Sequence, residues 1–205
     1  MNDLRTARVM RYLEASRDVL GAALADRVLV DAISRTAEVI TDALRAGNKI
    51  LLAGNGGSAA DAQHLATELM VRFYIDRAPL PALALGTDTS AATAIGNDLG
   101  FEQLFARQVL ALGQPGDVFI GLSTSGRSPN ILAACKAARE RKMTVVGFTG
   151  AKGDQLAALC DLTVRVPSDK TPLIQQVHLA GGHIVCEIVE EALASNDTIA
   201  PQGKG

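Results

Sequence analysis

The sequence predicts a single α/β domain, a three-layer sandwich with a five-stranded parallel sheet and an N-terminal pair of helices. Short, continuous apolar runs alternate with helical stretches, which is typical of a parallel sheet covered on both faces. Loops rich in glycine or serine follow two of these runs. The length of 205 residues suits one domain, and 48% apolar residues without any Trp indicate an interior of Ala, Val, Ile and Leu.

The first segment, residues 3–45, spaces its apolar residues by three and four, with acidic and basic residues between them. This period predicts two amphipathic helices that break near Ala25 and Asp26. We assign residues 1–46 to helices of the same domain and residues 47–195 to the α/β unit. The polar, Gly- and Pro-containing residues 196–205 are expected to be frayed.

The remaining elements follow in alternation. The strands are predicted from continuous apolar runs of strand length, and the helices from good helix formers with helical period. The strand runs are 49–54, 81–86, 118–123, 144–150 and, more weakly, 162–167. The helical stretches between and after them are 58–73, 101–112, 129–142 and 172–193.

Composition and charge exclude several classes of protein. Twenty Lys and Arg against 22 Asp and Glu give a net charge of −2, so no global positive field attracts a nucleic-acid backbone. The N-terminus lacks the order of a secretory signal, and no apolar run approaches the roughly 18 residues of a membrane span. Three scattered cysteines, Cys135, Cys160 and Cys186, indicate reduced core residues of a cytoplasmic protein.

A glycine loop, residues 54–58, follows the first strand run. Its glycines permit close approach of the backbone to a ligand, and Ser58 is expected to cap the next helix. Gly54, Gly56 and Ala59 match a dinucleotide-binding G-x-G-x-x-A pattern. That reading is disfavoured because the acidic residue required about 20 positions later is missing, and Asp88 lies 34 positions after Gly54.

A serine loop, residues 123–128, follows the third strand run and precedes Pro129. Four hydroxyls and a glycine gather where a helix begins and backbone N–H groups point outward. Such a place suits phosphate, because the helix dipole and N–H groups attract it and the hydroxyls direct hydrogen bonds. The other interpretation is a simple serine-rich turn.

Polar residues inside two helices form a second group. Asp61, His64 and Glu68 share one face of the helix after the glycine loop, and a His–Glu pair at i, i+4 suits zinc or forms an ordinary surface ion pair. The last helix, for which Thr171 is the expected N-cap, carries the other polar residues, namely Gln175, Gln176, His178 and His183. Gln175 and His183 are about 12 Å apart along an ideal axis, so joint coordination of one ion would require both side chains to reach inward.

Together these motifs resemble one family. The segments AGNGGSAADAQH with Glu68, TAIGND at 93–98, STSGRS at 123–128 and TPLIQQVHLAGGH at 171–183 are similar to sedoheptulose 7-phosphate isomerases of the SIS (sugar isomerase) superfamily. The resemblance covers about residues 5–195. It implies a flavodoxin-like strand order, a SIS domain over 47–195, and a homotetramer with active sites between subunits. The helices of residues 1–46 would contribute to the interfaces of this tetramer.

The resemblance also implies roles for particular residues. Glu68 and His183 would form the acid/base pair, which suits an isomerisation that removes a proton from carbon and returns one to its neighbour. One Zn²⁺ per subunit would be held by His64, Glu68, Gln175 and His183. The phosphate would be bound by Ser123, Thr124, Ser125 and Ser128, and the sugar by Asn55, Gly56, Gly57, Asn97 and Asp98, with Glu68 and Gln175 also touching the substrate.

The expected activity is conversion of D-sedoheptulose 7-phosphate to D-glycero-D-manno-heptose 7-phosphate, the first step of bacterial ADP- or GDP-heptose synthesis for surface polysaccharide. One departure from the family pattern is Gln176, where a Glu is usual, so a negative charge beside a proposed ligand is missing. Two alternatives remain. The first is a non-enzymatic SIS protein that binds a replication initiator, and the second is a SIS isomerase or sensor for another phosphosugar.

Overall fold

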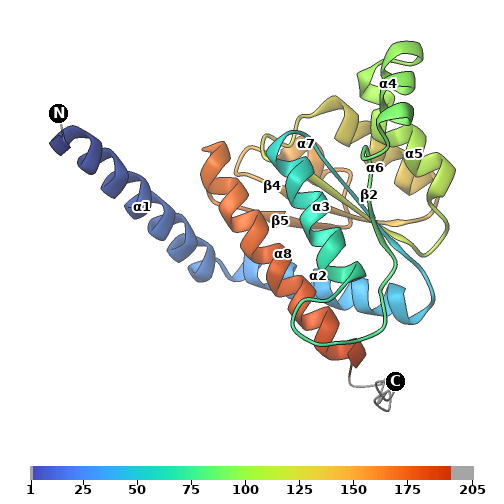
Figure 1. Ribbon diagram of the computed structural model, residues 1–205, viewed down its shortest axis with the longest axis horizontal. Helices are drawn as coiled ribbons and strands as arrows, with labels where there is room; N and C mark the ends of the chain where they lie inside the picture. The colour runs from blue at the N-terminus through green and yellow to red at the C-terminus, as the bar shows by residue number, and fades with distance from the viewer. Residues whose placement is uncertain (1, 195–205) are drawn as a thin grey trace, which may run out of the picture.

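The computed structural model describes residues 2–194 and has the predicted three-layer α/β architecture (Figure 1). Five parallel strands form one sheet in the order β2-β1-β3-β4-β5, which is the expected flavodoxin-like order. The tail expected at residues 196–205 lies outside the described residues. The strands are β1 (Ile50–Gly54), β2 (Ala82–Ala84), β3 (Val118–Ser123), β4 (Thr144–Thr149) and β5 (Leu162–Arg165).

Helices cover both faces of this sheet. Two of them were not expected: α4 escaped prediction because it is built largely from small residues and buries none of them, and α7 has only one turn. The helices of the described chain are α1 (Asn2–Ala25), α2 (Arg27–Arg45), α3 (Gly57–Met70), α4 (Thr89–Asp98), α5 (Leu104–Leu112), α6 (Pro129–Glu140), α7 (Asp154–Ala157) and α8 (Thr171–Ala194), with a 3-10 turn at Phe101–Gln103.

Alternate residues of each strand feed two separate cores, because side chains alternate between the faces of a sheet. Ile50 and Leu52 of β1 join α2, α3 and α8 on one face. Leu51 and Ala53 join α5 and α6 on the other face. Burial on both faces explains why the strands appear in the sequence as continuous apolar runs.

The predicted helix starts were partly wrong. Asp26 does separate α1 from α2, since its Oδ1 accepts hydrogen bonds from Val28 N and Leu29 N. Ser58, however, is a buried residue inside α3, and Gly56 occupies the N-cap with φ +56°, a backbone conformation that favours glycine. Thr171 is the first residue of α8, because Ile174 N already bonds to the carbonyl of Lys170.

The helix α1 extends away from the sheet as a single long rod (Figure 1). Val19 and Ala23 pack into the core, but an adjacent stripe of large apolar side chains is exposed. The stripe follows helical spacing and consists of Val9, Met10, Leu13, Leu20 and Leu24. Within the described chain, no helix has the length and hydropathy of a membrane span.

A buried carboxylate lies at the edge of the sheet where the parallel strands begin. Asp117 precedes β3 and is 1% exposed. It accepts hydrogen bonds from the backbone N–H groups of Lys49 and Gln114, at 3.0 and 2.8 Å. The Lys49 ammonium lies 2.6 Å from its second oxygen. Asp117 therefore ties the entries of β1 and β3 together, at the edge opposite the glycine and serine loops.

Candidate active site

The glycine loop and the serine loop lie next to each other because β1 and β3 are parallel neighbours, with Gly54 paired to Leu122. The chain order of the strands reverses between β1 and β3. In open α/β sheets, ligands bind at the carboxyl ends of the strands at such a point. The two loops that the sequence singled out therefore meet at the expected ligand-binding edge.

A reciprocal amide pair joins the two loops. Asn55 donates to Asn130 at 2.9 Å, and Asn130 donates back to Asn55 at 2.8 Å. Asn130 is buried near the start of α6, so its polar group requires a partner. The sequence reasoning missed Asn130, although an amide next to Pro129 at the start of an apolar helix is a usable signal. The pair fixes the glycine loop relative to the serine loop.

The serine loop has internal bonds that orient its hydroxyls. Ser123 and Ser128 share a hydrogen bond of 2.9 Å, and Ser125 Oγ accepts from the Arg127 N–H. Gly126 makes the turn with φ +63°, and a Cβ there would come within 2.3 Å of Gly153 Cα. Ser128 is the N-cap residue of α6, but its hydroxyl does not cap the helix. This start of α6 thus retains the features of an anion-binding helix terminus.

A cavity of about 350 Å³ opens beside these loops. Asn97 and Asp98 are the last two residues of α4, just before Gly100 in the sequence, and both are exposed. The Asn97 amide donates a hydrogen bond to Asp98 at 2.7 Å. Their contact with a sugar stays a prediction. The residues that line the cavity are Asn55, Gly100, Phe101, Glu102, Ser128, Pro129 and Asn130.

Three proposed ligands converge between α3 and α8, and we call them the His–Glu cluster: His64, Glu68 and His183. His64 Nε2 lies 2.9 Å from His183 Nε2 and 3.1 Å from Glu68 Oε1. One ligand atom from each residue falls within 4.8 Å of the others. His64 is exposed, whereas Glu68 and His183 are half-buried. The cluster is thus open to solvent on one side.

Close packing of α3 on α8 brings the cluster together. A Cβ added to Gly182 would lie 2.5 Å from Leu65 Cδ1, so the absent side chain at 182 lets Leu65 fit against α8. His183 is the next residue on α8, and His64 precedes Leu65 on α3. The contact between Gly182 and Leu65 therefore sets the distance across which the two histidines meet.

Gln175 lies elsewhere on α8. Its amide packs against the glycine loop, since a Cβ on Gly57 would be 2.6 Å from Gln175 Nε2. The structure thus unites His64, Glu68 and His183, and places Gln175 beside Gly57; its role as a fourth ligand stays a prediction. Gln176 donates to the Tyr12 hydroxyl of α1 at 3.4 Å, so the departure from the family pattern lies at the contact of α8 with α1.

Two further titratable residues, Asp61 on α3 and His178 on α8, lie outside the His–Glu cluster. Burial raises the pKa of Asp61, which the nearby His64 partly opposes, and Asp61 Oδ2 is buried without a partner in the described chain. His178 is fully buried, contacts the Phe148 ring edge-on and bonds to the Thr149 carbonyl at 3.2 Å. Burial lowers the pKa of His178 to about 4, despite that hydrogen bond. His178 is therefore a neutral core residue.

The His–Glu cluster fits a divalent metal. Two imidazole nitrogens and one carboxylate are a donor set that catalytic zinc sites use, with a further position left for water or substrate. The ligand atoms come from two helices whose packing holds them, which keeps such a site in one geometry. The group in this structure is a candidate metal-binding group, and its chemistry does not by itself identify the metal.

Comparison with known proteins supports this interpretation of the site. The SIS domain model matches residues 11–150. A phosphoheptose isomerase of Rhodospirillum rubrum is 58% identical over 164 residues, covering 80% of this chain and 87% of that protein. A phosphoheptose isomerase of Aneurinibacillus thermoaerophilus is 50% identical over 98% of this chain and 99% of its own.

Solved structures give the same result. A phosphoheptose isomerase from Neisseria gonorrhoeae superposes with a TM-score of 0.84 at 42% identity, over 91% of this chain and 98% of that one. One from Francisella tularensis superposes with a TM-score of 0.87 at 37% identity, with the same coverage. The chain belongs to the SIS domain family and, within it, to the phosphoheptose isomerases.

Proposed function

We propose that this chain converts D-sedoheptulose 7-phosphate to D-glycero-D-manno-heptose 7-phosphate through an enediolate, the first step of heptose synthesis for bacterial surface polysaccharide. The observation that carries the proposal is the meeting of Glu68 and His183 within the His–Glu cluster. An aldose–ketose isomerase needs a base and a proton shuttle within reach of two adjacent carbons. The high identity to phosphoheptose isomerases supports the choice of substrate.

The two loops would hold the substrate. The hydroxyls of the serine loop and the start of α6 favour a phosphate, and Ser123, Thr124, Ser125 and Ser128 would bind it. Asn55, Gly56 and Gly57 would contact the sugar, together with Asn97, Asp98 and Gln175. His64 lies seven residues, or about 10 Å, along α3 from Gly57. A seven-carbon phosphosugar has a length suited to reach from the loops to the cluster.

Proton transfer would use Glu68 and His183. Glu68 is half-buried, and its carboxylate would take a proton from the carbon next to the carbonyl and return it to the neighbouring carbon. His183 would move a proton between the two substrate oxygens. His64, Glu68 and His183, with Gln175, would hold one Zn²⁺ per subunit. When bound, zinc supplies a Lewis acid that polarises a carbonyl and stabilises negative charge on oxygen.

The protein would act as a homotetramer with active sites at subunit interfaces. The exposed apolar stripe of α1 supports this, because such a stripe marks a protein interaction site. The open side of the His–Glu cluster supports it too, since a neighbouring subunit could exclude water there. The cytoplasmic location expected from the sequence remains a prediction.

Two alternatives are less favoured. A non-enzymatic SIS protein that binds a replication initiator has no need of an acid/base pair, whereas Glu68 and His183 are present and held together here. A SIS isomerase or sensor for another phosphosugar would use the same loops. It would differ in which sugar phosphate it converts or, as a sensor, only binds.

The test is incubation with sedoheptulose 7-phosphate and zinc, with NMR detection of the aldose product. We expect conversion that a chelator suppresses and zinc restores. A parallel panel of five- and six-carbon ketose phosphates should be turned over at least tenfold more slowly. Absence of conversion at high enzyme concentration would refute the proposed activity, and faster turnover of a shorter sugar would favour the other phosphosugar.

A further inference from the structure

Besides Asp117, a second buried carboxylate belongs to Glu190, which lies on α8 beyond the His–Glu cluster. Glu190 is 1% exposed and follows His183 by seven residues, which places both on the same face of α8. Its carboxylate accepts hydrogen bonds from three consecutive backbone N–H groups in the segment after α3. The donors are Phe73, Tyr74 and Ile75, at 2.7, 2.5 and 2.8 Å. Burial raises the pKa of Glu190, but these donors and Arg77 outweigh it and lower the pKa below its ordinary value.

Arg77 links this carboxylate to the end of α3. Its Nε lies 3.1 Å from Glu190 Oε1, and both side chains are nearly inaccessible, at 3% and 1%. Its terminal nitrogens donate to the carbonyls of Glu68 and Leu69 at 3.0 and 2.8 Å. These carbonyls belong to the last turn of α3, where no helical N–H can reach them. Arg77 therefore caps the turn that carries Glu68.

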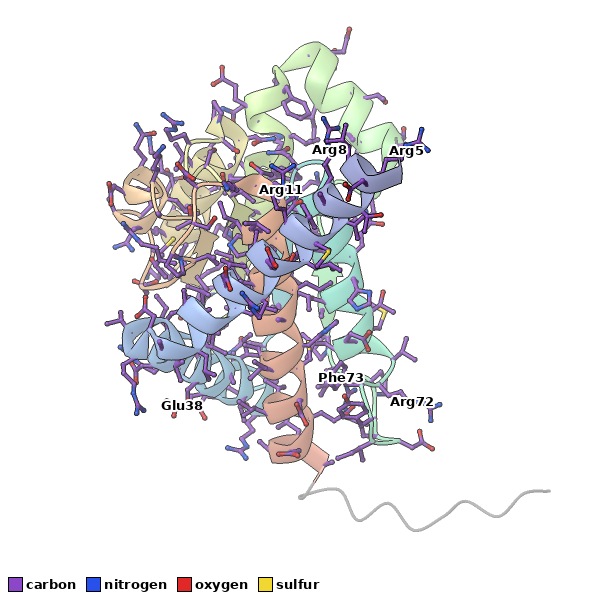
Figure 2. All side chains as sticks on the ribbon, turned by 90° about the vertical axis from the view of Figure 1, so that its left-hand side faces the viewer. Arg5, Arg8, Arg11, Glu38, Arg72 and Phe73 are labelled. Carbon is purple, nitrogen blue, oxygen red and sulfur yellow. The ribbon has the colours of Figure 1, made fainter. Side chains whose placement is uncertain are left out.

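The segment anchored by Glu190 also touches the other side of the cluster. The Phe73 ring lies 5.5 Å from the His183 ring, centroid to centroid. Figure 2 shows Phe73 on the part of this segment nearer α8, with Arg72 farther out. The backbone N–H of Phe73 is itself bound by Glu190. One buried carboxylate thus connects to His183 through Phe73 and to Glu68 through Arg77.

We infer that Arg77 and Glu190 are positioning residues that hold Glu68 and His183 in the geometry needed to bind metal and transfer protons. This inference rests on the proposed function for its catalytic part. Its physical basis is that groups behind metal ligands fix their orientation, and the loss of one such group typically weakens metal affinity about 10–100-fold. Arg77 lies at the end of α3 opposite the glycine loop, and Glu190 follows Gln175 by 15 residues on α8, so both act through Glu68 and His183.

The experiment compares two isosteric changes. Glu190→Gln keeps the shape but removes the charge and one acceptor of the backbone N–H groups. Asp117→Asn makes the same change in a carboxylate that is equally buried and also holds backbone N–H groups, at the opposite edge of the sheet. Calorimetry measures the affinity of each variant for zinc alone. Turnover of sedoheptulose 7-phosphate gives kcat and KM, and urea unfolding gives stability.

For Glu190→Gln we expect zinc affinity to fall about 10–100-fold and kcat about tenfold or more, with KM little changed. Asp117→Asn should lose stability but keep zinc affinity and kcat within about twofold of the wild type. Equal zinc affinities of the two variants would overturn the inference, as would a wild type that binds no zinc. A zinc effect without turnover by the wild type would uphold the positioning role and refute the proposed activity.

Arg77→Lys provides a second variant in case Glu190→Gln does not fold. Lysine keeps the positive charge beside Glu190 but lacks the planar fork that reaches both Glu68 and Leu69 carbonyls. We expect zinc affinity to drop about tenfold although the ion pair remains available. Wild-type zinc affinity in Arg77→Lys would show that capping of α3 does not position Glu68.

Discussion

Glu68 and His183 are proposed to serve both metal binding and proton transfer. Their ligand atoms lie within 4.8 Å of each other and of His64, although the two residues come from different helices. A group that binds the metal and also moves protons must do both within one small site. Replacing either side chain by a neutral amide therefore tests the assignment.

Glu68→Gln and His183→Gln should each lower kcat about 100-fold or more, because neither amide can accept and return a proton at neutral pH. Turnover of sedoheptulose 7-phosphate and oligomeric state are measured together. Glu38→Gln, an exposed residue of α2 far from the site, is the matched control and should keep wild-type turnover. A near-normal kcat in either site variant would disprove its role as an acid or base.

His178 gives the protein a pH-dependent stability that is separate from catalysis. Its folded pKa of about 4 lies below the ordinary 6.5, so the unfolded chain binds the proton more readily. The contribution of His178 is therefore present above pH 6.5 and is lost as pH falls toward 4. We expect metal-free protein to lose roughly 2 kcal/mol of unfolding free energy between pH 7 and pH 5 through this residue.

Urea unfolding at several pH values measures that loss. The comparison is His178→Asn, whose absolute stability is expected to be lower but whose stability should depend less steeply on pH. An unchanged pH slope in the variant would mean that burial does not lower the pKa of His178 in the folded protein.

At the scale of elements, two neighbouring glycines of α8 have different surroundings: Gly182 faces Leu65 of α3, whereas Gly181 faces Ile33 of α2. A Cβ at Gly182 would come within 2.5 Å of Leu65 Cδ1 and 3.1 Å of Leu65 Cγ. A Cβ at Gly181 would meet the terminal Cδ1 of Ile33 at 3.2 Å, which can move aside. The two neighbouring positions thus form a natural test and control.

Gly182→Ala should push α3 away from α8 and separate His64 from His183. We expect zinc affinity and kcat to fall about tenfold, and the cost of overpacking, about 1–3 kcal/mol, to exceed the roughly 1 kcal/mol gained in helix propensity. Gly181→Ala should stay within about 1 kcal/mol of the wild type. Calorimetry with zinc and urea unfolding measure both. Equal behaviour of the two variants would exclude the Gly182 contact as the determinant of the cluster.

For the whole molecule, the long helix α1 contacts mainly α8 and α2 within the described residues. Leu13 and Leu20 are 62% and 44% exposed and lie in the apolar stripe. Leu13→Glu combined with Leu20→Glu should dissociate the proposed tetramer, because burying two carboxylates in an apolar interface is costly. Sedimentation velocity measures the assembly. Ala7→Glu, exposed on α1 outside the stripe, should leave it intact, and a tetramer that survives the double change would exclude this stripe from the interface.

Local features of the sequence were enough to predict the layers of the fold. The strands β1, β3 and β4 lie close to the predicted bounds because residues buried on both faces leave continuous apolar runs. The short edge strand β2 was predicted too long, and α4 was not foreseen, since exposed small residues carry no apolar period. The predicted cap at Ser58 was wrong because the backbone at Gly56 takes a conformation that a sequence pattern does not reveal.

The sequence by itself determined the parallel α/β architecture, the two loops at the carboxyl edge of the sheet, and the pairing of His64 with Glu68 one turn apart. The family resemblance had already grouped His183 with His64 and Glu68. Only the tertiary structure showed that these side chains meet, across 119 residues from His64 to His183, and that Asn130, 75 residues from Asn55, joins the loops. Periodicity describes which face of one element is apolar. The distance between side chains on two elements depends on how closely they pack, and here the missing side chain of Gly182 against Leu65 sets that distance.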